Sequence, residues 1–210
     1  MTRSMFAWLG MTALVLVAAA NAIAMLMLPA FRSSLVLGLL AETPLSALTH
    51  FAGGAVAIAS GALQVNSRFR NRFIGAHRWI GRLYVVAVVL GGVSGFVLAV
   101  HSSGGSVVQV GFALLAVCWI GCTLNAYRYI RQGNVRAHRS WMIRSYALTL
   151  AAVTLRVYLP SSQIAGLPMA AAYAAIAWLC WVPNLLVAEW FVRSESSARA
   201  TRVQTAASTS

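Results

Sequence analysis

The segment from Trp79 to Val100, WIGRLYVVAVVLGGVSGFVLAV, carries one charged residue, Arg82. About 20 apolar residues in an α-helix are long enough to cross the ~30 Å hydrocarbon core of a bilayer. This segment therefore predicts a transmembrane helix, and apolar runs of similar length recur on both sides of it. Together they predict six spans: Phe6–Leu28, Ser46–Val65, Trp79–Val100, Val107–Ile130, Trp141–Leu159 and Pro168–Val192.

The composition supports this fold class. Of 210 residues, 60% are hydrophobic and 9% are charged, which leaves too little polar surface for a soluble globule. We expect an all-α, polytopic six-helix transmembrane bundle. Residues 1–45 would hold the first helix and an outer loop, 46–160 a histidine-bearing four-helix core, and 161–193 the sixth helix. Residues 194–210, rich in Ser, Ala and Thr, would form a disordered cytoplasmic tail.

The first span has the basic start and small-residue string of a secretory signal. Its apolar run nevertheless continues through Ile23 and Met25 to Leu28. We therefore expect an uncleaved helix, and the remaining topology is the same in either case.

All sixteen basic residues are arginines, and most lie in two clusters, Arg68–Arg82 and Arg128–Arg144. The positive-inside rule places these two loops and both termini in the cytoplasm, with Arg32 on the opposite side. The absence of lysine and the many alanines are typical of a GC-rich bacterial genome. The sequence therefore predicts a multi-pass protein of the bacterial cytoplasmic membrane.

A net charge of +13 would suggest nucleic acid as the partner of a soluble chain. Here the arginines lie at helix ends instead of on one soluble face, which excludes that function. We expect anionic lipid headgroups to bind at Arg68–Arg82 and Arg128–Arg144.

Acidic residues are scarce, since the chain has no Asp and its only acids are Glu42, Glu189 and Glu195. Paired-carboxylate catalysis, acidic proton relays and hard-cation sites therefore lack their ligands. Glu189 is expected to pair with Arg193, four residues on. The three cysteines have neither zinc nor thioredoxin-type spacing, and we expect them to pack in the core.

Two similar motifs predict an internal repeat. They are Ala76-His77-Arg78-Trp79 with Arg82 and Tyr84, and Ala137-His138-Arg139-Ser140-Trp141 with Arg144 and Tyr146. A parallel repeat would relate the second–third helix pair to the fourth–fifth pair by an axis along the membrane normal. The alternative is chance similarity between two basic loops that enter aromatic belts.

Helical spacing predicts that two histidines face small residues. His50 shares its face with Gly54, Ala57 and Gly61, which permits close helix approach. His77 lies on a glycine-containing face too, on the helix whose Gly91 and Gly95 form a GxxxG step.

The same spacing predicts two polar layers. Arg156 lies 18 residues after His138, which is five turns along one face. An inner layer would hold His77 and His138, and an outer layer His50 and Arg156. His101 is expected to lie apart from both, in the outer turn. Ionisable residues inside a bundle are candidates for function.

Histidines at one depth on separate helices can hold a haem iron. One hypothesis is that His77 and His138 ligate a b-type haem whose propionates meet Arg82 or Arg144. The alternative is that these residues are interfacial anchors. The predicted cofactor-binding set is His50, His77, His138, Arg82, Arg144 and Arg156.

The sequence around these residues resembles a bacterial family of membrane proteins, domain of unknown function 2306, over about residues 45 to 160. The resemblance lies in three segments: Thr49–Gly54, His77–Tyr84 and His138–Leu148, followed by Thr154-Leu155-Arg156. It implies an integral membrane protein and assigns no activity. A four-helix core with inward histidines is also similar to transmembrane b-type cytochromes in architecture, although this chain lacks their two histidines per helix.

Three functions remain open. The first is a noncatalytic membrane component or partner subunit, whose inward polar residues lock helix packing. The second is a haem- or quinone-linked electron-transfer protein, with His50 and Arg156 as an outer cofactor contact. The third is a small transporter, for which the polar residues Gln64, Asn125, Thr149 and Asn184 are suggestive.

Overall fold

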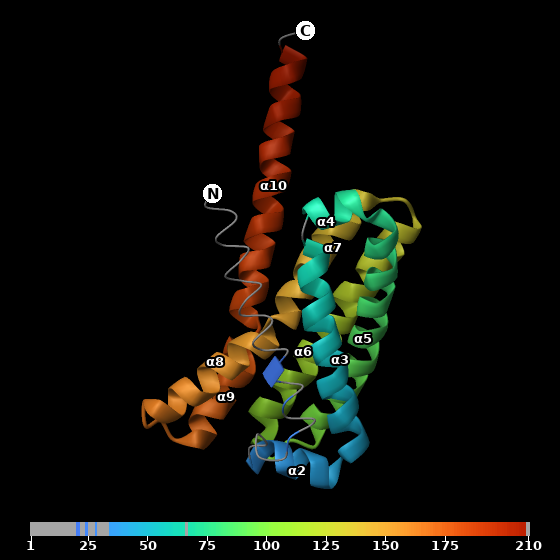
Figure 1. The fold of residues 1–210 in the computed structure, drawn as a ribbon. Coiled ribbons are helices and arrows are strands. Elements are labelled where there is room, and N and C mark those ends of the chain that lie inside the picture. The colour runs from blue at the N-terminus through green and yellow to red at the C-terminus, as the bar shows by residue number, and fades with distance from the viewer. Residues whose placement is uncertain (1–19, 22–23, 25–27, 29–33, 66, 209–210) are drawn as a thin grey trace.

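The computed structural model describes residues 20–21, 24, 28, 34–65 and 67–208. The predicted first span, Phe6–Leu28, and the question of its cleavage lie outside the described residues, apart from positions 20–21, 24 and 28. Within these ranges the chain forms helices and no strand (Figure 1). The helices are α2 (Ser34–Glu42), α3 (Pro44–Val65), α4 (Ser67–Arg72), α5 (Ile74–Val100), α6 (Gly105–Arg131), α7 (Val135–Thr149), α8 (Ala151–Ile164), α9 (Met169–Leu179) and α10 (Val182–Ser208).

Five helical stretches of the described chain are long and apolar enough to cross a membrane. They are Pro44–Gln64, Ile74–Val100, Gly105–Arg131, Val135–Ile164 and Met169–Ser197. Each overlaps one of the last five predicted spans, because 18 or more apolar residues in sequence leave few other stable arrangements in a bilayer.

The last two spans are interrupted, which the apolar runs did not predict. α7 ends at Thr149 and α8 begins at Ala151, with Leu150 shared as the cap of both. Here the Thr149 hydroxyl donates to the carbonyl of Ser145 at 3.1 Å, a side-chain bond that bends helices. α9 ends at Leu179, four residues before Pro183, which has no N–H to continue the ladder.

The core consists of α3, α5, α6 and α7, and each helix packs on the next in that order, with α7 also touching α3. α8 and α9 form a hairpin whose helix α9 packs on α6, while α10 runs back past α7 (Figure 1). The centre of the core is filled by large side chains, among them Tyr84, Val88, Trp119 and Tyr146, all buried. α5 and α7 therefore face each other diagonally across this centre.

α3 and α5 approach through glycine. A Cβ added to Gly53 would lie 2.8 Å from the carbonyl oxygen of Ala87 and 3.0 Å from Gly91 Cα. A Cβ at Gly54 would meet nothing within 4 Å. The contact with α5 therefore falls one residue before Gly54, the position on the predicted stripe. Gly91 and Gly95 of the predicted GxxxG step both lie in this interface, as a Cβ at Gly95 would lie 2.7 Å from His50 Nδ1.

The two arginine-rich connections lie at the same end of the bundle. α4 and the α6–α7 turn both lie there, and α10 extends beyond that end (Figure 1). Gly133, with φ of 74°, makes the α6–α7 turn, since glycine adopts positive φ without strain. Asn134 then caps α7 by accepting from the N–H of Ala137 at 3.0 Å, as a good N-cap residue does.

The carboxyl-terminal segment differs from its prediction. Residues 194–208, predicted to be disordered, continue α10 to Ser208. Two physical reasons account for this. Arg and Ala are strong helix formers, and Glu195 forms an ion pair with Arg139 of α7, which holds the first turn of the segment against the bundle.

Candidate functional site

The inner histidines occupy equivalent positions, because each is the fourth residue of its helix. His77 lies in the first turn of α5 and His138 in the first turn of α7. Seven residues further on, at nearly two turns, are Tyr84 and Ser145, whose hydroxyls are 2.7 Å apart. The faces that carry the two histidines therefore meet across the core, and the imidazoles are within electrostatic range of each other.

The two inner imidazoles differ in their hydrogen bonds. His138 Nδ1 lies 2.9 Å from the carbonyl oxygen of Ala126 on α6. A carbonyl can only accept, so Nδ1 donates this bond, and in the neutral tautomer that makes it Nε2 carries the lone pair. His77 Nδ1 is buried and has no hydrogen-bond partner in the described chain.

The outer histidine is fixed in the same manner as His138. His50 Nδ1 lies 2.8 Å from the carbonyl oxygen of Gly91 on α5, so its Nε2 also keeps a lone pair. Gly95 leaves the space for this ring. The charge of Arg156 acts on His50, so the predicted outer pair lies within electrostatic range.

Arg156 is held by α8 and by a residue of the amino-terminal part. Its Nη1 donates to the carbonyl of Ala152 at 2.9 Å, and its Nε donates to Asn21 Oδ1 at 3.1 Å. The sequence did not single out Asn21, since a lone polar residue near a small-residue string gives no sign of its partner. His101, as predicted, is exposed in the turn after α5, where Nδ1 bonds the carbonyl of Val97.

The arginines predicted to meet haem propionates point elsewhere. Arg82 is exposed and its guanidinium lies 4.7 Å from the ring of Trp79, itself 69% exposed. Arg144 stacks on Trp141 at 4.9 Å and forms an ion pair with Glu189 of α10 at 2.7 Å. In this structure the partners of the two guanidiniums are therefore tryptophan rings and, for Arg144, a carboxylate, and their predicted contact with haem propionates stays a prediction.

A buried network of hydroxyls and one indole joins the core helices. Tyr84 Oη lies 2.7 Å from Ser145 Oγ and 2.8 Å from Thr149 Oγ1. Trp119 Nε1 donates to Thr149 Oγ1 at 2.9 Å, and Thr123 Oγ1 lies 2.6 Å from Ser145 Oγ. All five side chains are buried. The sequence suggested only Thr149, because hydroxyl residues spaced along an apolar helix do not reveal what they face.

Tyr146 completes the packing without joining this network. Its ring lies where a Cβ of Gly61 would be, and its hydroxyl is buried without a partner in the described residues. α3 therefore meets α7 through an aromatic ring on glycine.

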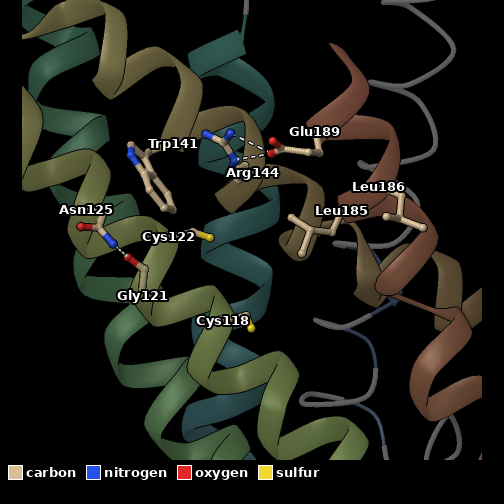
Figure 2. Close-up of a pocket in the computed structure, with 9 residues that line it drawn as sticks. All are labelled: Cys118, Gly121, Cys122, Asn125, Trp141, Arg144, Leu185, Leu186 and Glu189. Carbon is tan, nitrogen blue, oxygen red and sulfur yellow. Dashed lines mark hydrogen bonds and ion pairs between the residues drawn. The ribbon is translucent and has the colours of Figure 1, made fainter. Parts of the chain in front are cut away.

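A separate cleft of about 510 Å³ opens between α6, α7 and α10 (Figure 2). One end is apolar, and the other holds the Arg144–Glu189 pair beside Trp141. The lining residues are Cys118, Gly121, Cys122, Asn125, Trp141, Arg144, Leu185, Leu186 and Glu189. Apolar composition alone predicted the cysteines as core residues, and Cys122 is buried, but Cys118 is partly exposed.

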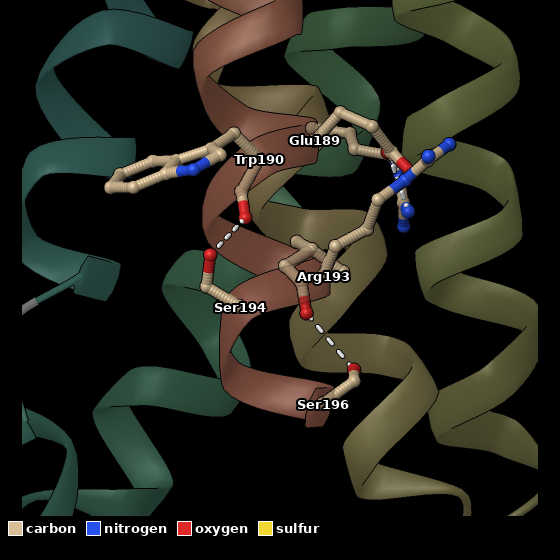
Figure 3. Close-up of polar contacts among 7 residues, drawn as sticks. Glu189, Trp190, Arg193, Ser194 and Ser196 are labelled. Carbon is tan, nitrogen blue, oxygen red and sulfur yellow. Dashed lines mark hydrogen bonds and ion pairs between the residues drawn. The ribbon is translucent and has the colours of Figure 1, made fainter. Parts of the chain in front are cut away.

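Glu189 binds two arginines at once. Arg193 Nε donates to Glu189 Oε1 at 2.8 Å, which confirms the predicted pair, while Arg144 Nε donates to Oε2 at 2.8 Å. Along the same helix, Ser194 and Ser196 donate to the carbonyls of Trp190 and Val192 (Figure 3). The hydroxyls of Ser194 and Ser196 are thus satisfied within the helix, while Glu189 and Glu195 bind arginines of α7.

Among the residues that the structure describes, no group of three His, Cys, Asp or Glu side chains is placed to hold a metal ion. The comparisons with curated proteins and with solved structures gave no match. A family model described as predicted membrane protein (DUF2306) matches residues 47–192, more than half of the chain and all of α5 to α9. The chain therefore belongs to this family of predicted membrane proteins, and its apolar helices are those of a multi-pass membrane protein.

Proposed function

We propose that the chain is a noncatalytic membrane component, a partner subunit or assembly factor whose polar core fixes the arrangement of its helices. The main support is the buried network of Tyr84, Trp119, Thr123, Ser145 and Thr149. It fills the centre of the four-helix core, and its members bind one another. Interhelical hydrogen bonds of this kind stabilise membrane bundles by about 0.6 kcal/mol each, and at most about 2 kcal/mol.

The histidines support the same proposal, because two of them tie one helix to another. His50 joins α3 to α5, and His138 joins α7 to α6. The polar residues suggested as a transport lumen are also engaged within the protein. Gln64 donates to the carbonyl of His77, Asn125 to that of Gly121, and Asn184 to Thr154 Oγ1.

The test compares His138→Ala with His101→Ala in the detergent-purified protein. The first variant removes a bond between helices, while His101 bonds only within its own helix. We expect His138→Ala alone to lower the melting temperature, with the visible absorption spectrum unchanged. The same chain, isolated from its native membrane in mild detergent, should retain a membrane-protein partner. A chain that purifies alone and carries a catalytic activity would contradict the proposal.

A haem-binding function is the second candidate, and one observation favours it. His138 keeps its Nε2 lone pair through the Nδ1 bond to a carbonyl, the arrangement usual for metal-ligating histidine, and the nearby His77 Nδ1 lacks a partner. Haem would supply one-electron chemistry between these side chains. Reduced-minus-oxidised absorption spectra of the purified protein distinguish the two functions. A Soret band at near-stoichiometric loading that is lost in His138→Ala would support haem binding over the noncatalytic function.

A further inference from the structure

The cleft between α6, α7 and α10 has a polarity that changes along its length. Along α6, the lining runs from Cys118 in the middle of the helix to Asn125, which lies about 10 Å nearer the arginine-rich end at 1.5 Å per residue. Along α10, it runs in the same direction from Leu185 to Glu189. One end of the cleft is therefore apolar and the other is charged.

The charged end lies at the level of the aromatic belt. Trp141 lines the cleft beside Arg144, and Trp190, 69% exposed, follows Glu189 on α10. Trp side chains favour the headgroup level of a bilayer. The apolar end thus faces acyl chains while the polar end lies near headgroups, which is the orientation of a lipid in the leaflet on the arginine-rich side.

The charges at this end do not cancel. Arg144 and Arg193 share the one carboxylate of Glu189, so one positive charge is left over. Arg144 uses Nε and Nη2 on that carboxylate, and in the described part of the chain no acceptor lies against its Nη1. A guanidinium has five N–H donors, so Arg144 can bind Glu189 and a second anion together.

The cleft is also open to the bilayer. Leu186 on its rim is 65% exposed, and a Cβ on Gly121 in its wall would meet nothing within 4 Å. An acyl chain can therefore enter from the side, between α6 and α10.

From this combination we propose that the cleft binds one anionic phospholipid, with its phosphate at Arg144 and Arg193 and an acyl chain along Cys118, Gly121 and Leu185. Arg144 is the selective group, because its side chain is only 18% exposed and charge-assisted hydrogen bonds strengthen where water is excluded. The proposal is independent of the scaffold function and of haem binding.

The test is a lipid titration of the full-length, delipidated protein in detergent, read by native mass spectrometry. Dioleoylphosphatidylglycerol is the anionic probe, and dioleoylphosphatidylcholine is the zwitterionic control. We expect one tightly retained phosphatidylglycerol and at least about tenfold weaker binding of phosphatidylcholine, the ratio that one charge-assisted bond supplies.

Two charge variants separate lipid recognition from loss of the ion pair. Arg144→Gln and Glu189→Gln both remove the Arg144–Glu189 ion pair. Arg144→Gln removes the proposed lipid-binding guanidinium, whereas Glu189→Gln leaves that guanidinium without its counterion. Arg144→Gln should weaken phosphatidylglycerol binding about tenfold, whereas Glu189→Gln should preserve or strengthen it. Equal losses in the two variants would overturn the proposal.

A steric pair keeps the test decisive if a charge variant fails to fold. Gly121→Leu fills the cleft, and Gly54→Leu adds the same side chain at a position of α3 that is equally free of contacts. Gly121→Leu should lose the retained lipid and Gly54→Leu should keep it. Identical retention in both, or equal affinity for the two lipids, would show that the cleft is not a specific site.

Discussion

The hairpins α3–α5 and α6–α7 are held together by different means. In the first, Gly53 brings α3 against the backbone of α5 at Ala87 and Gly91. In the second, Trp119 and Thr123 of α6 bind hydroxyls of α7. Each hairpin also has one histidine whose Nδ1 binds a carbonyl of the partner helix. The comparison teaches that this fold combines the two ways in which helices associate in lipid, close approach and polar contact.

The two related motifs differ for a reason visible in their spacing. Tyr84 lies seven residues after His77, but Tyr146 lies eight after His138. One extra residue turns the side chain by about 100° around the helix. Ser145 therefore occupies the place that Tyr84 has on α5, and Tyr146 turns towards Gly61 of α3. The inserted residue thus lets Ser145 of one segment bind Tyr84 of the other. We propose that the two segments form an internal repeat that became complementary through this one residue.

The largest loss of stability should come from adding a side chain at Gly53, in the contact between α3 and α5. Gly53→Leu places a side chain against the Ala87 carbonyl, and we expect it to lower the free energy of unfolding by about 3 kcal/mol, the upper range for overpacking. Denaturation in SDS, followed by circular dichroism, measures it. Gly54→Leu is the matched control and should be close to neutral. Equal losses would mean that backbone approach does not hold this hairpin.

Removing the Thr149 hydroxyl in the second hairpin should lower the free energy of unfolding by a somewhat smaller amount. Thr149→Val keeps the shape of the side chain but deprives the buried Trp119 Nε1 of its acceptor. We expect a loss of about 2 kcal/mol, since an unsatisfied buried donor costs about 1–3 kcal/mol. The same SDS titration applies, with Ser161→Ala as a control from the exposed part of α8, where the hydroxyl bonds only a carbonyl of its own helix. If Thr149→Val left the free energy of unfolding unchanged, the hydroxyl network would not be what holds this hairpin together.

Removing the hydroxyl of Tyr84 should lower the free energy of unfolding by about 1 kcal/mol more than removing that of Tyr146. Tyr84→Phe removes two hydrogen bonds, for which we expect a loss of about 1 kcal/mol. Tyr146→Phe removes a buried hydroxyl that has no partner in the described chain, so it should be neutral or slightly stabilising. Thermal melting of the two variants side by side measures the difference. A larger loss for Tyr146→Phe would reveal a bound molecule at its hydroxyl.

The smallest effect should come from the ion pair that joins α7 to the end of α10. Arg139 and Glu195 are 52% and 40% exposed, and exposed pairs contribute up to about 1 kcal/mol. Arg139→Gln should therefore lower stability by about 0.5 kcal/mol or less, and 1 M salt should abolish the difference. Hydrogen exchange of residues 196–208 tests the local consequence. Faster exchange is expected, and unchanged exchange would show that the pair does not hold the segment.

The sequence was sufficient for the five described spans and insufficient for the contacts between them. Apolar runs located the ends of these spans to within about six residues, because length and hydropathy are local properties. They did not predict the break at Leu150, which depends on hydroxyls that bind across the core. The face of His50 was predicted from periodicity, yet its acceptor, Gly91, is a main-chain atom with no signature in sequence. Similarly, the Glu189–Arg193 pair follows from spacing, whereas Arg144 reaches Glu189 only in three dimensions.

The carboxylates that pair with α7 both reside on α10, which leaves the ribosome after α7. A nascent chain that ends before Glu189 has Arg144 in an apolar segment without its counterion, which is unfavourable within a bilayer. Insertion of α10 therefore supplies the counterion of Arg144, a residue translated some 45 residues before Glu189. Folding intermediates that lack α10 should thus be recognisable to membrane quality-control proteases by one uncompensated guanidinium.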